Sequence, residues 1–199
     1  MSPLVESIKL KDGVIYNMEY HQQRLNRSMK ELFPVAAAVD LVKELAGIQI
    51  PSSGTYKVRV VYGPSIGRIE IEPYTLRSVN SLKVVYCNDI DYHLKFTDRQ
   101  TLNDLYSQRE NCDDIIIVKH GQITDSFSAN LLFFDGQHWL TPDSPLLKGT
   151  QRQYLLDNGV IFERNITLND LISFSKVGLI NAMIDFDEMP IINLKDIYL

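Results

Sequence analysis

The spacing of hydrophobic and polar residues predicts that the chain opens with a β-hairpin. Two apolar-rich runs, residues 4–10 and 14–18, flank Lys11-Asp12-Gly13, and an Asp-Gly pair between such runs is a strong hairpin signal. Apolar residues then recur near helical spacing over residues 19–33, and Pro34 closes that segment. We therefore expect a hairpin followed by a helix.

The remainder of the first half predicts a mixed α+β lobe. A second helix is expected over about residues 37–48. Polar and apolar residues alternate over 55–62 and 68–73, on either side of Gly63-Pro64, and residues 82–86 form a further apolar-rich run. These three segments are predicted strands.

The second half predicts short strands mixed with helices. Residues 87–96 lack clear periodicity, and Thr97-Asp98-Arg99-Gln100 has the form of a capping box that starts a helix. Strands at 113–118, 123–124, 131–134 and 139–140 predict a β-meander. A helix from Thr150 should end at Asn158-Gly159, a short helix should start at residue 167, and strands at 177–183 and 189–192 should follow.

These elements predict an α+β protein of two lobes. With 199 residues, of which 45% are hydrophobic, the chain can bury a sizeable core. We expect an N-terminal α+β lobe over residues 1–88, an inter-lobe linker over 89–97 and a C-terminal α/β lobe over 98–199.

Charge and cysteine content narrow the class of protein. Twenty basic and twenty-five acidic side chains give a net charge of −5, so we expect no nucleic-acid partner. Cys87 and Cys112 cannot form a disulfide scaffold and have no histidine at metal-ligand spacing, which favours a reducing cytoplasm and predicts no metal site. No apolar run approaches the roughly 18 residues of a bilayer span, so no membrane association is expected.

Five spaced segments carry a resemblance to a known family. They are Glu6-Ser7-Ile8-Lys9 with His21-Gln22-Gln23-Arg24-Leu25; Leu94-Lys95-Phe96; Ile123-Thr124-Asp125-Ser126-Phe127-Ser128-Ala129-Asn130-Leu131; Thr141-Pro142 to Leu147-Lys148-Gly149-Thr150-Gln151-Arg152; and Ile180-Asn181-Ala182-Met183. Together they resemble the class IV aminotransferase family, which includes branched-chain and D-amino-acid aminotransferases and 4-amino-4-deoxychorismate lyase. The resemblance implies the D-amino-acid aminotransferase-like fold of fold type IV pyridoxal-phosphate enzymes.

The resemblance implies that Lys95 holds pyridoxal 5'-phosphate. Only a primary amine forms a reversible imine with the aldehyde of that cofactor, and the pKa of lysine falls readily on burial, so the same group can also carry a proton. The alternative is an ordinary surface lysine, as for Lys57, Lys83, Lys119 and Lys148. Lys95 differs from these because it lies on a loop between a predicted strand and a predicted helix.

The other implied cofactor contacts concern the ring nitrogen and the phosphate. Asp125 takes the place of the carboxylate that keeps the pyridine nitrogen protonated, where family members usually have glutamate. The implied phosphate contacts are Arg24 and the helix start at Gly149-Thr150-Gln151, with Asn181-Ala182 closing the phosphate cup. The alternatives are local turn bonds at Asp125, a solvated Arg24, an ordinary helix cap and packing of Ala182 inside a strand. His21 is interpreted as structural.

Two reactions of the family share their first steps. Asn181-Ala182 resembles the aminodeoxychorismate lyases, which release pyruvate and give 4-aminobenzoate for folate synthesis, more than the branched-chain aminotransferases. Transamination of branched-chain or D-amino acids is the alternative. A non-catalytic homologue that binds the cofactor is a third possibility, motivated by Asp125 and by the short segment before Glu6. The resemblance also implies a homodimer that takes a small amino-acid-like substrate.

Overall fold

The N-terminal hairpin forms as the sequence predicts in the computed structural model, which describes residues 2–199. Strand β1 (Leu4–Lys11) pairs with β2 (Val14–Ile15) through Asp12 and Gly13, whose φ angles are 51° and 79°. Positive φ at both turn positions gives the backbone twist that a two-residue hairpin needs. The second strand is shorter than predicted because helix α1 (Met18–Leu32) begins soon after it.

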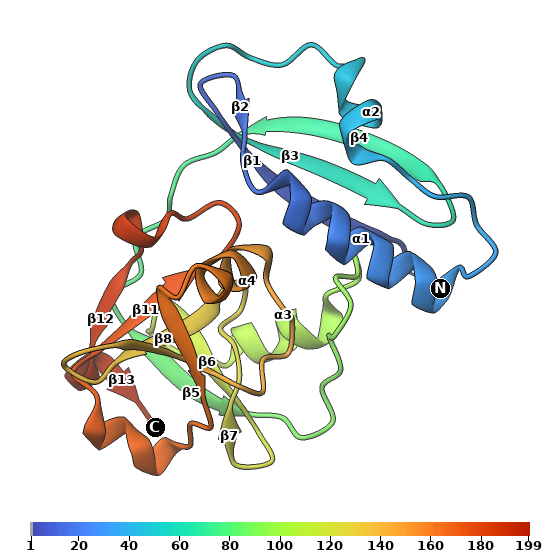
Figure 1. Cartoon of the computed structure of the whole chain (residues 1–199). Coiled ribbons are helices and arrows are strands. Elements are labelled where there is room, and N and C mark those ends of the chain that lie inside the picture. Colours follow the sequence, from blue (N-terminus) through green and yellow to red (C-terminus); the bar gives the residue numbers. More distant parts are fainter. Residues whose placement is uncertain (1) are drawn as a thin grey trace. The chain divides into compact units, whose positions relative to one another are not determined.

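Helix α1 covers one face of an antiparallel sheet (Figure 1). The sheet has the order β2-β1-β3-β4, with β3 (Thr55–Tyr62) and β4 (Ile66–Pro73) close to the predicted ranges. Helix α2 (Leu41–Ala46) is shorter than the predicted 37–48, because the side chain of Asp40 caps its start by accepting from the N–H groups of Val42 and Lys43. Apolar side chains of both helices and of β1, β3 and β4 form one core.

The chain crosses between two compact units three times. The first unit is Met1–Leu76 with Leu94–Asp98, and the second is Arg77–His93 with Arg99–Leu199. The first boundary therefore falls after residue 76 rather than after the predicted residue 88. The reason is that strand β5 (Leu82–Tyr86) pairs with strands of the second unit.

The second unit contains two sheets. One has the order β13-β5-β6-β7 and the other β10-β9-β8-β11-β12. Their remaining strands are β6 (Asp114–Lys119), β7 (Gln122–Ile123), β8 (Asn130–Phe134), β9 (Trp139–Pro142), β10 (Ile161–Arg164), β11 (Lys176–Ile180), β12 (Ile191–Asn193) and β13 (Ile197–Tyr198). The β-meander predicted over β6 to β9 is wrong, because β7 and β8 lie in different sheets. The second unit also contains two parallel pairs, β5–β6 and β9–β10.

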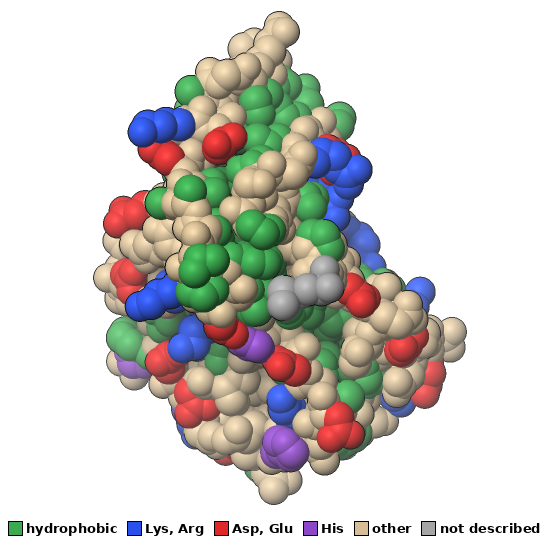
Figure 2. Space-filling view, turned by 90° about the vertical axis from the view of Figure 1, so that its right-hand side faces the viewer, with side chains coloured by type: hydrophobic (Ala, Val, Ile, Leu, Met, Phe, Trp, Pro, Cys, Tyr) green, Lys and Arg blue, Asp and Glu red, His purple; other side chains and the backbone are tan. Residues whose placement is uncertain are grey.

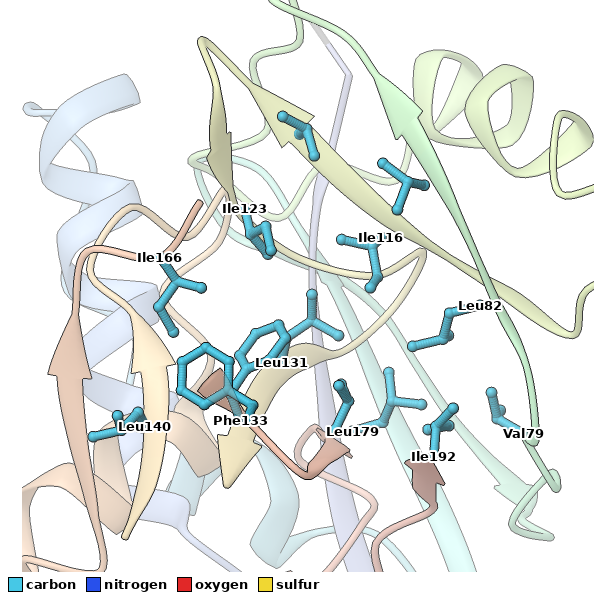
Figure 3. Close-up of a cluster of buried hydrophobic side chains, with 14 residues drawn as sticks. Val79, Leu82, Ile116, Ile123, Leu131, Phe133, Leu140, Ile166, Leu179 and Ile192 are labelled. Carbon is cyan, nitrogen blue, oxygen red and sulfur yellow. The ribbon is translucent and has the colours of Figure 1, made fainter. Parts of the chain in front are cut away.

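A hydrophobic core fills the space between these two sheets (Figure 3). Leu82 and Ile116 come from one sheet, and Leu131, Phe133 and Leu179 from the other. Alternate residues of the same strands point to the opposite faces, as strand geometry requires. There they meet helix α3 (Gln100–Ser107) on one sheet and helix α4 (Thr150–Asp157) on the other.

The helix starts and ends test several local predictions. Helix α3 begins at Gln100 with Arg99 as its N-cap and no side-chain cap, so the capping box predicted at residues 97–100 is wrong. Helix α4 ends before Gly159, whose φ is 67°, as predicted. A capping box does form at Thr167 and Asp170, where 3-10 helix η1 (Leu168–Ser173) starts. Further 3-10 turns are η2 (Phe186–Glu188) and η3 (Leu194–Asp196).

Acidic and basic side chains are interspersed over the face that Figure 2 presents. Within residues 2–199, no helix has the length and apolar character needed to cross a membrane. The same residues contain no group of three or more histidine, cysteine or acidic side chains arranged to hold a metal ion.

Candidate functional site

Lys95 belongs to the first unit, although the chain on both sides of its short segment belongs to the second. Its carbonyl oxygen accepts a hydrogen bond from the N–H of Val5 at 2.9 Å, and Phe96 forms an antiparallel bridge with Leu4. Residue 95 lies in the connection between β5 and α3, and pairing of this connection with β1 fixes the position of the lysine backbone within the first unit.

A buried triad lies beside this lysine in the first unit. Glu6, on the face of β1 that α1 covers, is fully buried. Nε and Nη2 of Arg24 donate to its two carboxylate oxygens at 2.9 and 2.5 Å, and Nδ1 of His21 lies 2.6 Å from Oε2. The two α1 residues are three apart, which places them on one face of the helix.

The charges of the triad set its protonation. Burial alone would raise the pKa of Glu6, but the charge of Arg24 and hydrogen bonds from His21 and Arg24 outweigh it and hold this pKa at about 2. Burial lowers the pKa of His21, and the nearby cations Arg24 and Lys95 add to that effect against the opposing pull of Glu6. Because Glu6 is ionised and can only accept, Nδ1 of His21 carries the proton that they share.

Arg24 does not present its whole guanidinium to a ligand. Its Nε and Nη2 atoms form the bidentate pair with Glu6, so this edge is occupied by a protein carboxylate and not by the phosphate that the sequence analysis assigned to it. A phosphate at Arg24 would therefore have to bind outside this edge of the guanidinium. His21 is structural in the sense predicted, with Glu6 as the partner that the sequence analysis had not assigned.

Asp125 lies in the second unit, where it bridges to Asn130, the first residue of β8. Its Oδ1 accepts from Nδ2 of Asn130 at 2.7 Å, and its Oδ2 accepts from the N–H of Leu147 at 2.9 Å. An ionised carboxylate has about four acceptor positions, so the bonds from Asn130 and Leu147, with the backbone contribution of Leu146, leave it able to accept another from a protonated ring nitrogen. Burial raises the pKa of Asp125 to about 6, against the opposing effects of Leu147, Asn130 and Arg152.

The raised pKa of Asp125 predicts a pH dependence of the cofactor-free protein. Since the folded pKa of about 6 lies above the ordinary aspartate value of 3.8, this group favours folding below pH 3.8, and its contribution is lost as pH rises through 6. We expect up to about 3 kcal/mol of unfolding free energy to be lost between pH 4 and 7 from this group. Urea unfolding of wild type and Asp125→Asn across that range should show the slope in wild type alone. Equal slopes would contradict the burial cost assigned to Asp125.

The start of α4 combines features that favour an anion. Gly149 is its N-cap, no side chain caps it, and its first turn contains no acidic residue. Thr150, which is buried, adds a hydroxyl beside the backbone N–H groups of that turn. The N–H groups and the helix dipole at a helix N-terminus favour negative charge.

Gly149 also explains how this helix start is positioned. A Cβ on Gly149 would collide with Oδ1 of Asn130, the residue whose amide donates to both Asp125 and the carbonyl oxygen of Leu147. The glycine therefore permits the close approach that links the helix start to the Asp125 carboxylate. Gln151 is buried in the same turn.

Replacing this glycine tests the contact. Gly149→Ala should lower the unfolding free energy by about 1–3 kcal/mol, because the methyl group must displace Asn130 from its two hydrogen bonds. Chemical denaturation measures the change. Gly47→Ala is the matched control, since a Cβ there meets nothing within 4 Å. A cost at Gly149 no larger than at Gly47 would show that Asn130 moves aside freely.

Asn181 and Ala182 follow β11 in the same unit. Nδ2 of Asn181 donates to the carbonyl oxygen of Ser128 at 3.2 Å, and its Oδ1 accepts from the N–H of Met183 at 2.9 Å. Because Ile180 pairs with Asn130 across the sheet, this loop lies beside the start of β8. Ala182 is half-buried in that loop rather than inside the strand.

The predicted site residues therefore form one group in each unit. Lys95 and Arg24 lie in the first unit with Glu6 and His21, and the remaining residues lie together in the second: Asp125, Gly149, Thr150, Gln151, Asn181 and Ala182. The set supplies a primary amine, a guanidinium, an anion-binding helix start and a buried carboxylate. This donor set fits an aldehyde-bearing pyridine phosphate.

Comparison with known proteins identifies the family. The model of the amino-transferase class IV family matches residues 3–191. A protein of Haemophilus influenzae without an assigned function is 38% identical over 186 residues, covering 92% of this chain and 98% of that protein. A crystal structure of a provisionally named 4-amino-4-deoxychorismate lyase from Haemophilus somnus is 38% identical, with a TM-score of 0.87, and covers 92% of this chain and 97% of that one.

A more distant structure shares the fold. The branched-chain amino acid aminotransferase of Escherichia coli is 15% identical, with a TM-score of 0.71 over 98% of this chain and 76% of that one. The chain belongs to the class IV aminotransferase family, whose members depend on pyridoxal phosphate. It is an enzyme of the aminotransferase or lyase type, with the fold type IV architecture that the sequence predicted.

Proposed function

We propose that the protein binds pyridoxal 5'-phosphate. Lys95 would hold the aldehyde carbon, Asp125 the ring nitrogen, and the α4 start with Arg24 and the loop at Asn181-Ala182 the phosphate. The observation that carries this proposal is the link between Asp125, Asn130 and Gly149, which joins a buried carboxylate to an uncapped helix N-terminus. Family membership supports the same cofactor.

The residues have separate tasks in the reaction. When bound, the cofactor acts as an electron sink for negative charge on the substrate carbon. Asp125, ionised beside a protonated ring nitrogen, would keep that proton in place. The free Lys95 amine would remove a proton from the substrate and return it at a second position. In the triad, buried hydrogen bonds to Glu6 hold Arg24 and His21 in place.

We further propose that the reaction is that of a 4-amino-4-deoxychorismate lyase, in which a pyruvate unit leaves and 4-aminobenzoate forms. Support comes from the relative of known structure that bears this name provisionally and is 38% identical over nearly its whole length. The Asn181-Ala182 pair at the predicted phosphate loop is consistent with it.

Two assays test this choice of reaction. The cofactor-loaded protein should release pyruvate and 4-aminobenzoate from 4-amino-4-deoxychorismate, measured by coupled reduction of pyruvate and by fluorescence of the product. The same protein should give no keto acid from a panel of branched-chain and D-amino acids with 2-oxoglutarate. Activity in the second assay and none in the first would show an aminotransferase instead.

We also propose a cytoplasmic homodimer that takes a small amino-acid-like substrate. The two cysteines, Cys87 and Cys112, are free thiols, which suits a reducing compartment. Sedimentation velocity of the purified protein measures the oligomeric state, and a monomer at micromolar concentration would contradict the dimer.

A further inference from the structure

Arg99 has an environment that does not suit an unpaired cation. It lies in the second unit at the N-cap of α3, the end where the helix dipole is positive, and the first turn of that helix contains no acidic residue. Its side chain is half-buried, and burial lowers its pKa, with only partial compensation from Tyr92 and Asp114. Burial and the helix dipole both disfavour the positive charge.

Neighbouring side chains fix the guanidinium but do not neutralise it. It lies over the ring of Phe127 at 4.2 Å, and its Nη2 donates to the carbonyl oxygen of Phe127 at 2.5 Å. Phe127 stacks in turn on Tyr106 with a centroid separation of 4.2 Å, and Arg109 lies over the far face of that stack at 4.2 Å from the Tyr106 ring. Contact with the Phe127 ring and carbonyl oxygen restricts the rotation of the Arg99 guanidinium.

No carboxylate among residues 2–199 forms an ion pair with Arg99. The closest acid in electrostatic terms, Asp114, is already engaged: Oδ2 accepts from Arg77 at 2.8 Å, and Oδ1 accepts from the N–H groups of Ile115 and Phe127 at 2.8 and 3.1 Å. Nε of Arg99 is buried and has no acceptor in the described part of the chain. The guanidinium of Arg99 therefore has an N–H group without an acceptor in the described part of the chain, and no carboxylate there pairs with its charge.

The position of Arg99 relates it to the proposed site. Phe127, on which it lies, is two residues beyond Asp125, the proposed partner of the ring nitrogen. Along the chain, Arg99 follows Lys95 by four residues, so their Cα atoms are within about 14 Å whatever the arrangement of the units. An arginine near both groups is within reach of a substrate whose proton Lys95 would move.

We propose that Arg99 binds a carboxylate of the substrate and so selects anionic amines. The inference rests on the proposed cofactor site and adds the residue that recognises the substrate. A planar guanidinium held by a ring on one face is suited to bidentate carboxylate contact, and a bound carboxylate supplies the counter-charge that the protein lacks.

A matched pair of ligands and variants tests the proposal. Calorimetry on the cofactor-loaded protein compares 4-aminobenzoate with its neutral analogue 4-aminobenzamide. Wild type should prefer the carboxylate, and Arg99→Gln should weaken its binding by about 10- to 100-fold while leaving the amide unchanged. Arg109→Gln is the control, since it removes the arginine at the other end of the same stack. In turnover, the Arg99 variant should raise KM far more than it lowers kcat.

The failures of the two proposals are distinguishable. If wild type shows no absorbance band of lysine-bound cofactor, the cofactor proposal fails. If the band forms but wild type does not prefer the carboxylate, or Arg99→Gln binds it as wild type does, the inference about Arg99 is wrong. Arg99→Lys, which keeps the charge without the planar fork, provides the comparison if the glutamine variant does not fold, and it should show an intermediate loss.

Discussion

Lys95→Ala should abolish the visible absorbance band that pyridoxal phosphate gives when added to the wild-type protein. The band reports a covalent link to a primary amine, and no other residue type can supply that reversible link. The same substitution should lower kcat by about 100- to 10,000-fold, because the proton carrier is lost with the attachment point. Borohydride reduction followed by peptide mass spectrometry should place the cofactor of wild type on the peptide that contains residue 95.

Lys148→Ala is the appropriate control for this experiment. Lys148 is exposed and lies between Leu147, whose N–H bonds to Asp125, and Gly149 at the start of α4. It is therefore a lysine beside the proposed phosphate site that the proposal leaves without a task. A band that survives Lys95→Ala and disappears in Lys148→Ala would show that the cofactor is bound to Lys148 and that our assignment to Lys95 is wrong.

Glu6→Gln should lower the unfolding free energy at pH 7 by about 3 kcal/mol. The change leaves Arg24 buried without its carboxylate partner, and breaking a buried ion pair from one side costs about 3–5 kcal/mol. The pKa of Glu6 gives a similar figure, because a shift from 4.5 to about 2 corresponds to about 3 kcal/mol. Urea unfolding at constant ionic strength measures the difference.

The pH dependence of the same difference provides a second test. The folded pKa of Glu6 lies below the ordinary glutamate value of 4.5, so its stabilising contribution is complete above pH 4.5 and is lost as pH falls toward 2. The gap in stability between wild type and Glu6→Gln should therefore close across that window. Glu70→Gln removes the partner of Arg59 on the half-exposed side of the sheet and should cost less than about 1 kcal/mol. A gap that stays constant from pH 5 to 2 would refute the assigned pKa.

Local sequence signals predicted where helices and strands lie better than they predicted which strands pair. The Asp12-Gly13 turn and the strand at residues 82–86 could be located from sequence, because turn chemistry and periodicity act over a few residues. The sheet to which residues 82–86 belong could not, since its neighbour β6 begins at Asp114. Strand β10 was not predicted because it lies at a sheet edge and only Ile161 in it is buried.

Glu6 is the residue of the candidate site whose part the sequence analysis missed, and a signal for it was present. It occupies the inward face of β1 with Leu4, Ile8 and Leu10, where the alternation calls for an apolar side chain. An acid in that position requires a buried partner. What the sequence could not supply was the register that sets α1 across this strand and brings Arg24 to it.

The lysine segment also has a consequence for how the protein is made. Strand β1 pairs along its length with β3 on one side. On its other side, β2 pairs with Leu10 and Lys11. Near the start of β1 on that side, residues 95 and 96 pair with Val5 and Leu4. A nascent chain that has emerged only to residue 76 would therefore expose part of β1 as an open edge, a template for pairing with other chains. Lys95, the residue proposed to bind the cofactor, belongs to the segment 94–98 that covers this edge. A truncated chain without this segment would therefore lose the reactive amine and also expose the strand edge that promotes aggregation.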